Sequence, residues 1–277
     1  MIIEKYFGID REAAQQLIDS TKNMTHEKSG DNGFQNTKVF LFDEYAVLQE
    51  ENLNFRNVST ADPDLKHLED IAVTLLDLQT QGVNVVPILA FQSDNGNGYI
   101  IQSRAKGAEL YDRDKVQSSD KDYILERIEL LSNAPQEHFD KFLADAIKII
   151  VDARIIVDFI GKDNFFYDET IGFQFIDLHS HDDYVYGLDD EKLQVKHAVK
   201  GCFLPCYYDT VPQHRDTVSK ILPKLTDKER AILKERNKKI FEKCRDSMIN
   251  NGIAEEAVSE IIRSNEYISR MQQLDLL

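Results

Sequence analysis

The chain has 277 residues, of which 42% are hydrophobic and 30% are charged, a composition typical of a globular protein with one large domain or two small lobes. Its 49 acidic side chains outnumber 33 basic ones, and the resulting net charge of −16 argues against nucleic acid or an anionic membrane as a partner. Three cysteines without framework spacing, together with an N-terminus that lacks an apolar or basic leader, predict a cytoplasmic protein.

The N-terminal part of the chain predicts a helix followed by strands. Residues 9–22 carry apolar side chains at helical spacing, and Asp10 is a suitable N-cap. A polar stretch with two glycines follows at 23–36. The run 38–49 then predicts two strands joined by a turn at 43–44.

A long helix is predicted next, at residues 62–82. Asp62 is a suitable N-cap for it, Pro63 occupies the first helical position, and leucines and isoleucines recur at helical spacing. Residues 83–102 predict two more strands, joined by a turn at 93–97. The first hundred residues therefore predict a sheet with one long helix.

The remainder of the chain, from residue 111, is predicted to be mostly helical. Amphipathic helices are expected at 121–132 and 138–154. The stretch 157–179 is different, because two runs rich in aromatic residues flank a turn at 168–172. This pattern predicts a β-hairpin within a helical region.

Polar side chains gather at the open end of this hairpin. Asn164 precedes its first strand and Asp177 follows its second, so the two are expected to approach each other although 13 positions separate them. Paired side-chain oxygens suit Mg²⁺, which takes few protein ligands and completes its shell with phosphates and water. Asp158 is then available to position or deprotonate a hydroxyl group, and Lys162 lies in the same segment. The alternative is a solvated structural hairpin with polar ends.

This stretch resembles the catalytic segment of the protein-kinase-like superfamily, which includes aminoglycoside and choline kinases. In that family a catalytic Asp is followed by a metal-binding Asn, a hairpin and a second metal-binding Asp, and the spacing from Asn164 to Asp177 matches. The resemblance implies ATP and Mg²⁺ as cofactors, Asn164 and Asp177 as metal ligands, and Asp158 and Lys162 as catalytic residues. Asp158 precedes Asn164 by six positions where the family usually has five, and residues 156–157 replace the usual His-Arg.

The resemblance also implies roles for residues in the N-terminal part. The strand position of the family's ATP-binding lysine corresponds to Gln49, and Lys38 on the neighbouring strand is either its replacement or a surface lysine. Glu69 lies near the spacing of the helix glutamate that pairs with that lysine. The glycines of 23–36 belong either to a phosphate loop or to a surface loop.

The segment 99–110 resembles the family's hinge, an extended linker with Gly-x-x-Leu before the second lobe. Here that motif starts at Gly107. An extended hinge exposes backbone N–H and C=O groups, which can pair with an adenine edge. Gln102 and Arg104, which lie in this segment, are candidate nucleotide-binding residues.

Together these patterns predict an α+β protein with a bilobal protein-kinase-like fold. An N-terminal lobe, 1–103, is expected to hold an antiparallel sheet and one long helix, and a mainly helical lobe, 104–277, the catalytic hairpin. The leading functional hypothesis is an ATP- and Mg²⁺-dependent phosphotransferase that acts on a small hydroxylated molecule or on a protein. The alternative is a catalytically impaired pseudokinase that binds nucleotide or protein, which Gln49 and the missing His-Arg support. The acceptor is not predicted.

Overall fold

The computed structural model describes residues 3–25, 28–31, 36–51, 63–94, 97–153, 155, 157, 159, 164–176, 195–196, 198–199 and 217–277. Contacts divide the chain into two compact units, Met1–Ala105 and Lys106–Leu277, named here the first and the second unit. The lobe boundary that the sequence places between residues 103 and 104, and the bilobal arrangement itself, stay predictions.

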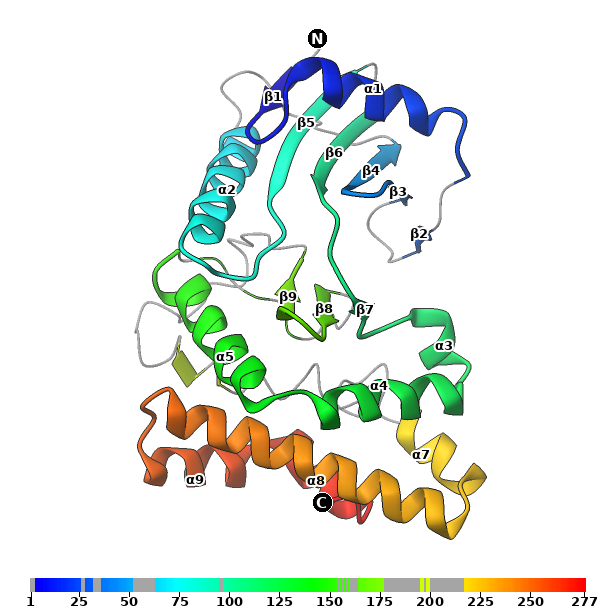
Figure 1. Ribbon diagram of the computed structural model, residues 1–277, viewed down its shortest axis with the longest axis vertical. Helices are drawn as coiled ribbons and strands as arrows, with labels where there is room; N and C mark the ends of the chain where they lie inside the picture. The colour runs from blue at the N-terminus through cyan, green and yellow to red at the C-terminus, as the bar shows by residue number, and fades with distance from the viewer. Residues whose placement is uncertain are drawn as a thin grey trace. The chain divides into compact units, whose positions relative to one another are not determined.

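The first unit contains a six-stranded sheet in which every neighbouring pair is antiparallel (Figure 1). Its order is β1-β5-β6-β4-β3-β2. The strands are β1 (Ile3–Tyr6), β2 (Lys28–Asp31), β3 (Asn36–Leu41), β4 (Tyr45–Glu51), β5 (Ile88–Asp94) and β6 (Asn97–Ser103). A long helix, α2 (Pro63–Thr80), lies between β4 and β5 in the chain. The predicted sheet and long helix are confirmed, but β5 begins only after Pro87, which has no N–H group to donate to a neighbouring strand.

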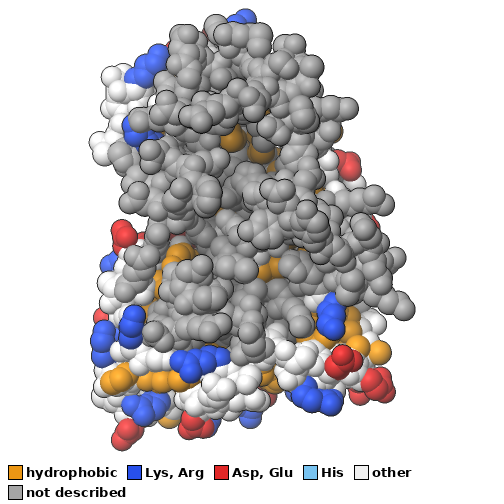
Figure 2. Space-filling view, turned by 180° about the vertical axis from the view of Figure 1, so that it is seen from behind, with side chains coloured by type: hydrophobic (Ala, Val, Ile, Leu, Met, Phe, Trp, Pro, Cys, Tyr) orange, Lys and Arg blue, Asp and Glu red, His pale blue; other side chains and the backbone are white. Residues whose placement is uncertain are grey.

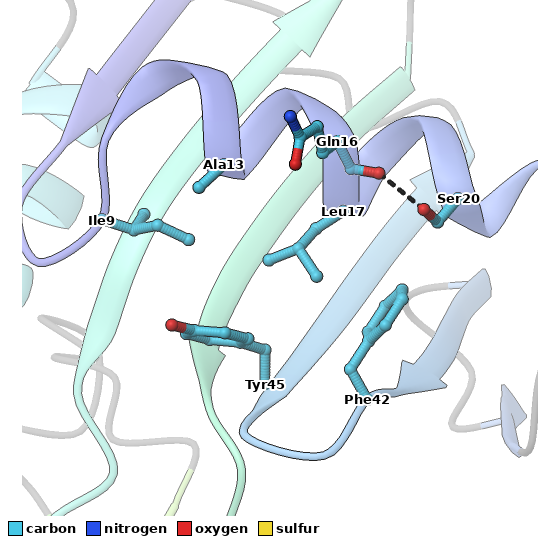
Figure 3. A pocket seen from close by; sticks show the side chains of 7 residues that line it. All are labelled: Ile9, Ala13, Gln16, Leu17, Ser20, Phe42 and Tyr45. Carbon is cyan, nitrogen blue, oxygen red and sulfur yellow. Dashed lines mark hydrogen bonds between the residues drawn. The ribbon is translucent and has the colours of Figure 1, made fainter.

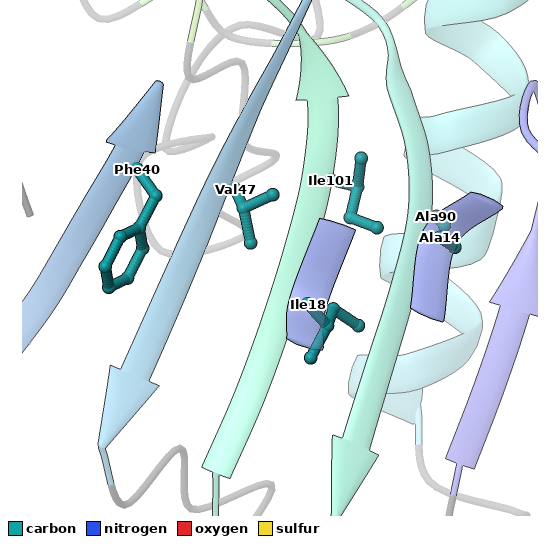
Figure 4. Close-up of a cluster of buried hydrophobic side chains, with 6 residues drawn as sticks. All are labelled: Ala14, Ile18, Phe40, Val47, Ala90 and Ile101. Atoms are coloured by element: carbon teal, nitrogen blue, oxygen red, sulfur yellow. The ribbon is translucent and has the colours of Figure 1, made fainter. Parts of the chain in front are cut away.

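Helix α1 (Arg11–Thr21) covers one face of this sheet. It begins at Asp10, whose carboxylate accepts a hydrogen bond from the Ala13 N–H at 2.8 Å, as the N-cap pattern predicts. Two of its buried side chains belong to a cluster with side chains of four strands (Figure 4): Ala14, Ile18, Phe40, Val47, Ala90 and Ile101. This side of the sheet is named the α1 face.

Helix α2 contacts β5 and lies behind the sheet when α1 is in front (Figure 4). Its Leu76 and Leu89 of β5 both approach Gly8, where an added Cβ would lie 3.7 Å from one and 2.6 Å from the other. Because successive side chains of a strand point to opposite faces, a strand can present side chains to α1 on one face and to α2 on the other. The two helices therefore bury opposite faces of one sheet.

The second unit is mainly helical and contains a small antiparallel sheet. Its helices are α3 (Arg113–Gln117), α4 (Lys121–Asn133), α5 (Gln136–Val151), α7 (Thr217–Ile221), α8 (Asp227–Asn250), α9 (Glu255–Ser264) and α10 (Glu266–Gln273). Its strands, in the order β7-β8-β9, are β7 (Ala108–Glu109), β8 (Phe165–Asp168) and β9 (Gly172–Phe175). The predicted hairpin and the helices α4 and α5 are confirmed, although α5 ends before the predicted residue 154.

The hairpin is fixed by aromatic packing against α5. The ring of Phe142 lies 4.4 Å from that of Phe173 and 5.1 Å from that of Phe175, and both pairs are stacked. Phe165 and Tyr167, on the same face of the hairpin, are also buried. Since a slip of either strand by one residue would turn its two buried aromatic side chains away from α5, this packing sets the register.

Charged side chains of both signs are interspersed where α7 to α10 lie (Figure 2). On α8, for example, Lys239 pairs with Glu235 at 2.8 Å. Such mixing is typical of a solvated helix surface. Within the described residues, every helix is too short or too polar to cross a membrane. The expected absence of nucleic-acid and membrane partners, and the cytoplasmic location, stay predictions.

The α+β class is confirmed, with an antiparallel sheet in the first unit and many helices in the second. This arrangement is compatible with the kinase-like fold that the sequence predicts.

Candidate functional site

The open end of the hairpin lies where the sequence predicts a metal site. Asn164 is half-buried directly before β8, and its C=O accepts a hydrogen bond from the Ile176 N–H at 2.9 Å. This bond extends the β8–β9 pairing by one step, and Ile176 is followed in the sequence by Asp177. Asp177, Asp158 and Lys162 themselves lie outside the described residues.

The Mg²⁺ prediction depends on those residues. Asn164 supplies an amide oxygen, a hard ligand of the kind that Mg²⁺ takes. Among the residues that the structure describes, no group of three or more His, Cys, Asp or Glu side chains is placed to hold a metal. The pairing of Asn164 with Asp177 around Mg²⁺ therefore stays a prediction.

The predicted hinge continues into the same sheet as the hairpin. Strand β7, which lies in the Gly-x-x-Leu motif, pairs with β8 through Ala108 opposite Tyr167 and Glu109 opposite Phe166. The Leu110 N–H then donates to the Phe165 C=O at 3.2 Å. A strand of two residues leaves no periodic signal, so the sequence did not predict this pairing.

The glycine of the motif permits the close approach of these two segments. Gly107 has φ +81°, a conformation that favours glycine, and a Cβ there would lie 2.2 Å from the Tyr167 carbonyl oxygen. Any side chain at this position would displace the linker from β8.

Gln174 of β9 holds the linker one residue earlier. Its Oε1 accepts a hydrogen bond from the Lys106 N–H at 3.2 Å, and its Nε2 donates to the Lys106 C=O at 2.6 Å. Gln174 is only 6% exposed, so its amide satisfies both of these backbone groups inside the protein. Sequence reasoning missed this residue, and the available signal was one polar side chain between Phe173 and Phe175.

Helix α4 fixes the other end of the linker. The Arg127 Nε donates to the Glu109 C=O at 2.9 Å, and the Asp112 N–H donates to the Tyr123 hydroxyl at 2.8 Å. Burial raises the pKa of Tyr123 to about 12, so its hydroxyl keeps its proton at neutral pH and can donate to the Glu109 C=O at 3.4 Å. The linker is thus held by β8, β9 and α4.

Arg104, a predicted nucleotide-binding residue, makes two hydrogen bonds to backbone carbonyls of the first unit. Its N–H donates to the Glu44 C=O at 2.9 Å, and its guanidinium donates to the Phe42 C=O at 3.0 Å. These bonds join the end of β6 to the turn between β3 and β4. Gln102 is half-buried opposite Ala46, on the side of the sheet away from α1. Nucleotide binding by Gln102 and Arg104 stays a prediction.

Between Arg104 and Lys106 the backbone of Ala105 is different. Its neighbours on both sides have hydrogen-bonded N–H groups. The N–H and C=O groups of Ala105 make no hydrogen bond to any residue that the structure describes. Within the described part of the chain, Ala105 therefore has one backbone donor and one backbone acceptor without a protein partner.

Lys38 and Gln49 lie opposite each other on β3 and β4. Side chains alternate between the two faces along a strand, so Lys38 lies on the same face as Phe40, and Gln49 on the same face as Val47. That face is the α1 face. The family role assigned to Gln49 requires a side chain that points toward the helix of Glu69, which is α2. The alternation places Gln49 on the face opposite to the one that α2 covers, and the role that the resemblance assigns to Gln49 stays a prediction.

Two further predictions concern residues of the first unit that are only partly described. Glu69 lies within α2, but its side chain is outside the described part of the structure. Gly30 belongs to β2, opposite Thr37, and Gly33 is outside the described residues. Both the pairing of Glu69 and the phosphate loop stay predictions.

A separate apolar cavity of about 310 Å³ lies between α1 and the turn that joins β3 to β4 (Figure 3). It is lined by Ile9, Ala13, Gln16, Leu17, Ser20, Phe42 and Tyr45. The Ser20 hydroxyl donates to the Gln16 C=O at 2.7 Å and is directed to the helix backbone. With no carboxylate, lysine or arginine among its lining residues, this cavity does not suit phosphoryl transfer.

Comparison with known proteins adds little to this geometry. No family model matches the chain, and no curated protein matches it. Among solved structures, the chain is similar to the crystal structure of Rad53 1-466 in complex with AMP-PNP, at 12% identity, over 94% of this chain and 70% of that chain, with a TM-score of 0.39. A TM-score of this size does not establish a common fold, so no conclusion about function rests on this likeness.

Proposed function

We propose that this chain is an ATP- and Mg²⁺-dependent phosphotransferase of the kinase-like superfamily, with a small hydroxylated molecule or a protein as acceptor. The observation that carries the proposal is the pairing of β7 with β8. It joins the segment that resembles a nucleotide-binding hinge to the hairpin that begins at Asn164. Kinase-like chemistry needs a base-binding linker and a metal-binding hairpin, and these two segments share one small sheet.

In this proposal the base pairs with the backbone of the linker. The N–H and C=O groups of Ala105 form one hydrogen-bonding edge and require a base that offers an acceptor and a donor, as adenine does. Gln102 and Arg104 lie just before this edge in the sequence.

Asn164 and Asp177 are the proposed ligands of Mg²⁺, which neutralises charge on the phosphates when bound. Asp158 orients the acceptor hydroxyl and takes its proton, and Lys162 is the proposed cation beside it. The hydroxyl oxygen forms a bond to the γ-phosphorus, the bond from that phosphorus to the bridging oxygen breaks, and ADP leaves. Catalysis of this kind depends on positioning and on charge stabilisation.

One observation favours the second candidate, a pseudokinase that binds nucleotide without efficient turnover. Among the side chains of β3 and β4 that the structure describes, those that point away from the α1 face are Val39, Leu41, Ala46 and Leu48. These four side chains are apolar, so none of them supplies the positive charge that the strand lysine of the family provides. Loss of such a charge commonly slows catalysis by a factor of about 100 to 1,000.

The test is binding of MgATP to the intact chain. We expect millimolar ATP with Mg²⁺ to raise the melting temperature, and ATP with EDTA to raise it much less. Asp177→Asn should abolish the Mg²⁺-dependent part of the shift. Asp152→Asn, which removes an exposed carboxylate directly after α5, is the control and should leave the shift unchanged. If MgATP does not stabilise the parent chain, the phosphotransferase and the nucleotide-binding pseudokinase are both wrong, and a protein-binding module is left.

Asp158→Ala separates the two candidates. In an active phosphotransferase this variant binds MgATP like the parent but no longer consumes ATP with an acceptor. A parent chain that binds MgATP and shows no turnover with a panel of sugars, amines and peptides is a pseudokinase. ATP consumption that survives Asp158→Ala would exclude Asp158 as the base.

A further inference from the structure

We infer that Gln174 is a positioning residue that orients the backbone of Ala105 toward the nucleotide base. The inference rests on the proposed function and extends it, because Gln174 lies outside every site that the sequence predicts. Its side chain is in contact with the linker and not with the base.

The argument begins with the peptide plane that joins Ala105 to Lys106. The C=O of Ala105 and the N–H of Lys106 belong to one planar unit and point in opposite directions. Gln174 Oε1 accepts a hydrogen bond from this N–H at 3.2 Å. A contact that fixes the N–H therefore also fixes the direction of the Ala105 C=O, which is left available on the opposite side.

Only a carboxamide of this length can make both contacts at Lys106. Besides accepting from the N–H, Gln174 donates from Nε2 to the Lys106 C=O at 2.6 Å, so two successive peptide planes are held by one side chain. A glutamate has no donor for the C=O at neutral pH, and an aliphatic side chain has neither group. The aromatic neighbours of Gln174 on β9, which pack against α5, keep the strand beneath it rigid.

The rest of the linker is fixed by other groups. Arg104 is held by the Glu44 C=O on one side, and β7 is held by β8 on the other. Without Gln174, the two peptides on either side of Lys106 would have no hydrogen bond to a described residue. The loss should therefore act on the base-binding edge more than on global stability.

Two variants test this inference. Gln174→Met keeps the length of the side chain without either hydrogen bond, and Gln174→Asn keeps the amide but is too short to reach Lys106. Gln136→Met is the matched control, because Gln136 also donates to a backbone carbonyl of the second unit, that of Lys243 at 3.0 Å, but lies at the start of α5.

Two ligands are compared by calorimetry, MgATP and Mg-tripolyphosphate, which has the phosphates without the base. For both Gln174 variants we expect the affinity for MgATP to fall about tenfold, and that for tripolyphosphate to stay within about twofold of the parent. Hydrogen exchange, measured without ligand, should show faster exchange of the Lys106 amide. The Gln136→Met control should leave the two affinities and the exchange rate of the Lys106 amide as they are in the parent.

A merely structural role predicts a different result, in which the affinities for both ligands fall together. That outcome, unchanged affinity for MgATP, or unchanged exchange at Lys106 would overturn the inference while leaving the proposed function intact. A parent chain that binds no MgATP overturns the proposed function and this inference with it.

Discussion

At the scale of single residues, Gly107 combines a left-handed backbone conformation with close contact to the backbone of β8. Several glycines of the chain have positive φ, including Gly107 at +81° and Gly252 at +80°. They differ in their surroundings. An added Cβ at Gly107 meets the backbone of Tyr167 and Asp168 within 2.6 Å, whereas at Gly252 no atom lies within 4 Å.

This difference gives a paired prediction. Gly252→Ala should cost only the left-handed conformation, about 1 kcal/mol of unfolding free energy. Gly107→Ala should cost about 3 kcal/mol or more, because the backbone of β8 cannot move aside without disturbing the buried hairpin. Urea unfolding followed by helix circular dichroism measures both. Equal losses would mean that the linker is not seated on β8 as described.

At the scale of elements, the start of α8 shows how a helix end is tied to its neighbour. Glu229 accepts a hydrogen bond from the Thr226 N–H at 2.7 Å, and its own N–H donates to the Thr226 hydroxyl at 3.2 Å, a capping box. Lys121 of α4 pairs with the Glu229 carboxylate at 2.9 Å. Lys121 first, and then the two Thr226 donors, lower the pKa of Glu229 from 4.5 to about 2.

The lowered pKa predicts a pH dependence. The folded chain favours ionised Glu229, so its stabilising effect is complete above pH 4.5 and is lost as the pH falls toward about 2. The melting temperature of the parent should exceed that of Glu229→Gln at neutral pH, and the difference should shrink below pH 4.5. Glu260→Gln, at an exposed position of α9, controls for loss of a charge. A difference that is constant with pH would contradict the capping role.

At the scale of the whole molecule, the excess of acidic side chains has a physical consequence. A formal net charge of −16 makes the folded chain repel itself, and salt screens that repulsion. We expect the melting temperature at neutral pH to rise by about 2 to 4 °C between low salt and about 0.5 M NaCl. Near pH 4.9, the isoelectric point expected from the sequence, the same addition should have little effect. A salt effect of equal size at both pH values would have another cause.

Local patterns in the sequence determined which elements form. Helices α1, α2, α4 and α5 follow from apolar side chains at helical spacing, and the hairpin of β8 and β9 from aromatic runs around a turn. These signals suffice to locate a helix or a hairpin because its backbone hydrogen bonds join residues that are close together in the chain. The α+β class and the position of Asn164 at the open end of the hairpin were predictable for the same reason.

The faces of the strands were decided by tertiary structure. The sequence identifies β4 as a strand, but it does not say which of its alternating sides meets α1 and which meets α2. Burial of Val47 with Ile18 of α1 decides this, and by alternation it places Gln49 on the α1 face as well. A one-residue difference in alignment is enough to exchange the two faces.

The contacts of the linker could also be found only in three dimensions. Gln174 lies 68 positions after Lys106, and no local pattern relates a polar residue in an aromatic strand to the backbone of a distant segment. The hydrogen bonds between them exist because α5 holds the hairpin in one register, and because Gly107 lets the linker approach β8. Local periodicity determined the elements of this protein, whereas the partners of its buried polar groups depended on packing that brings distant segments together.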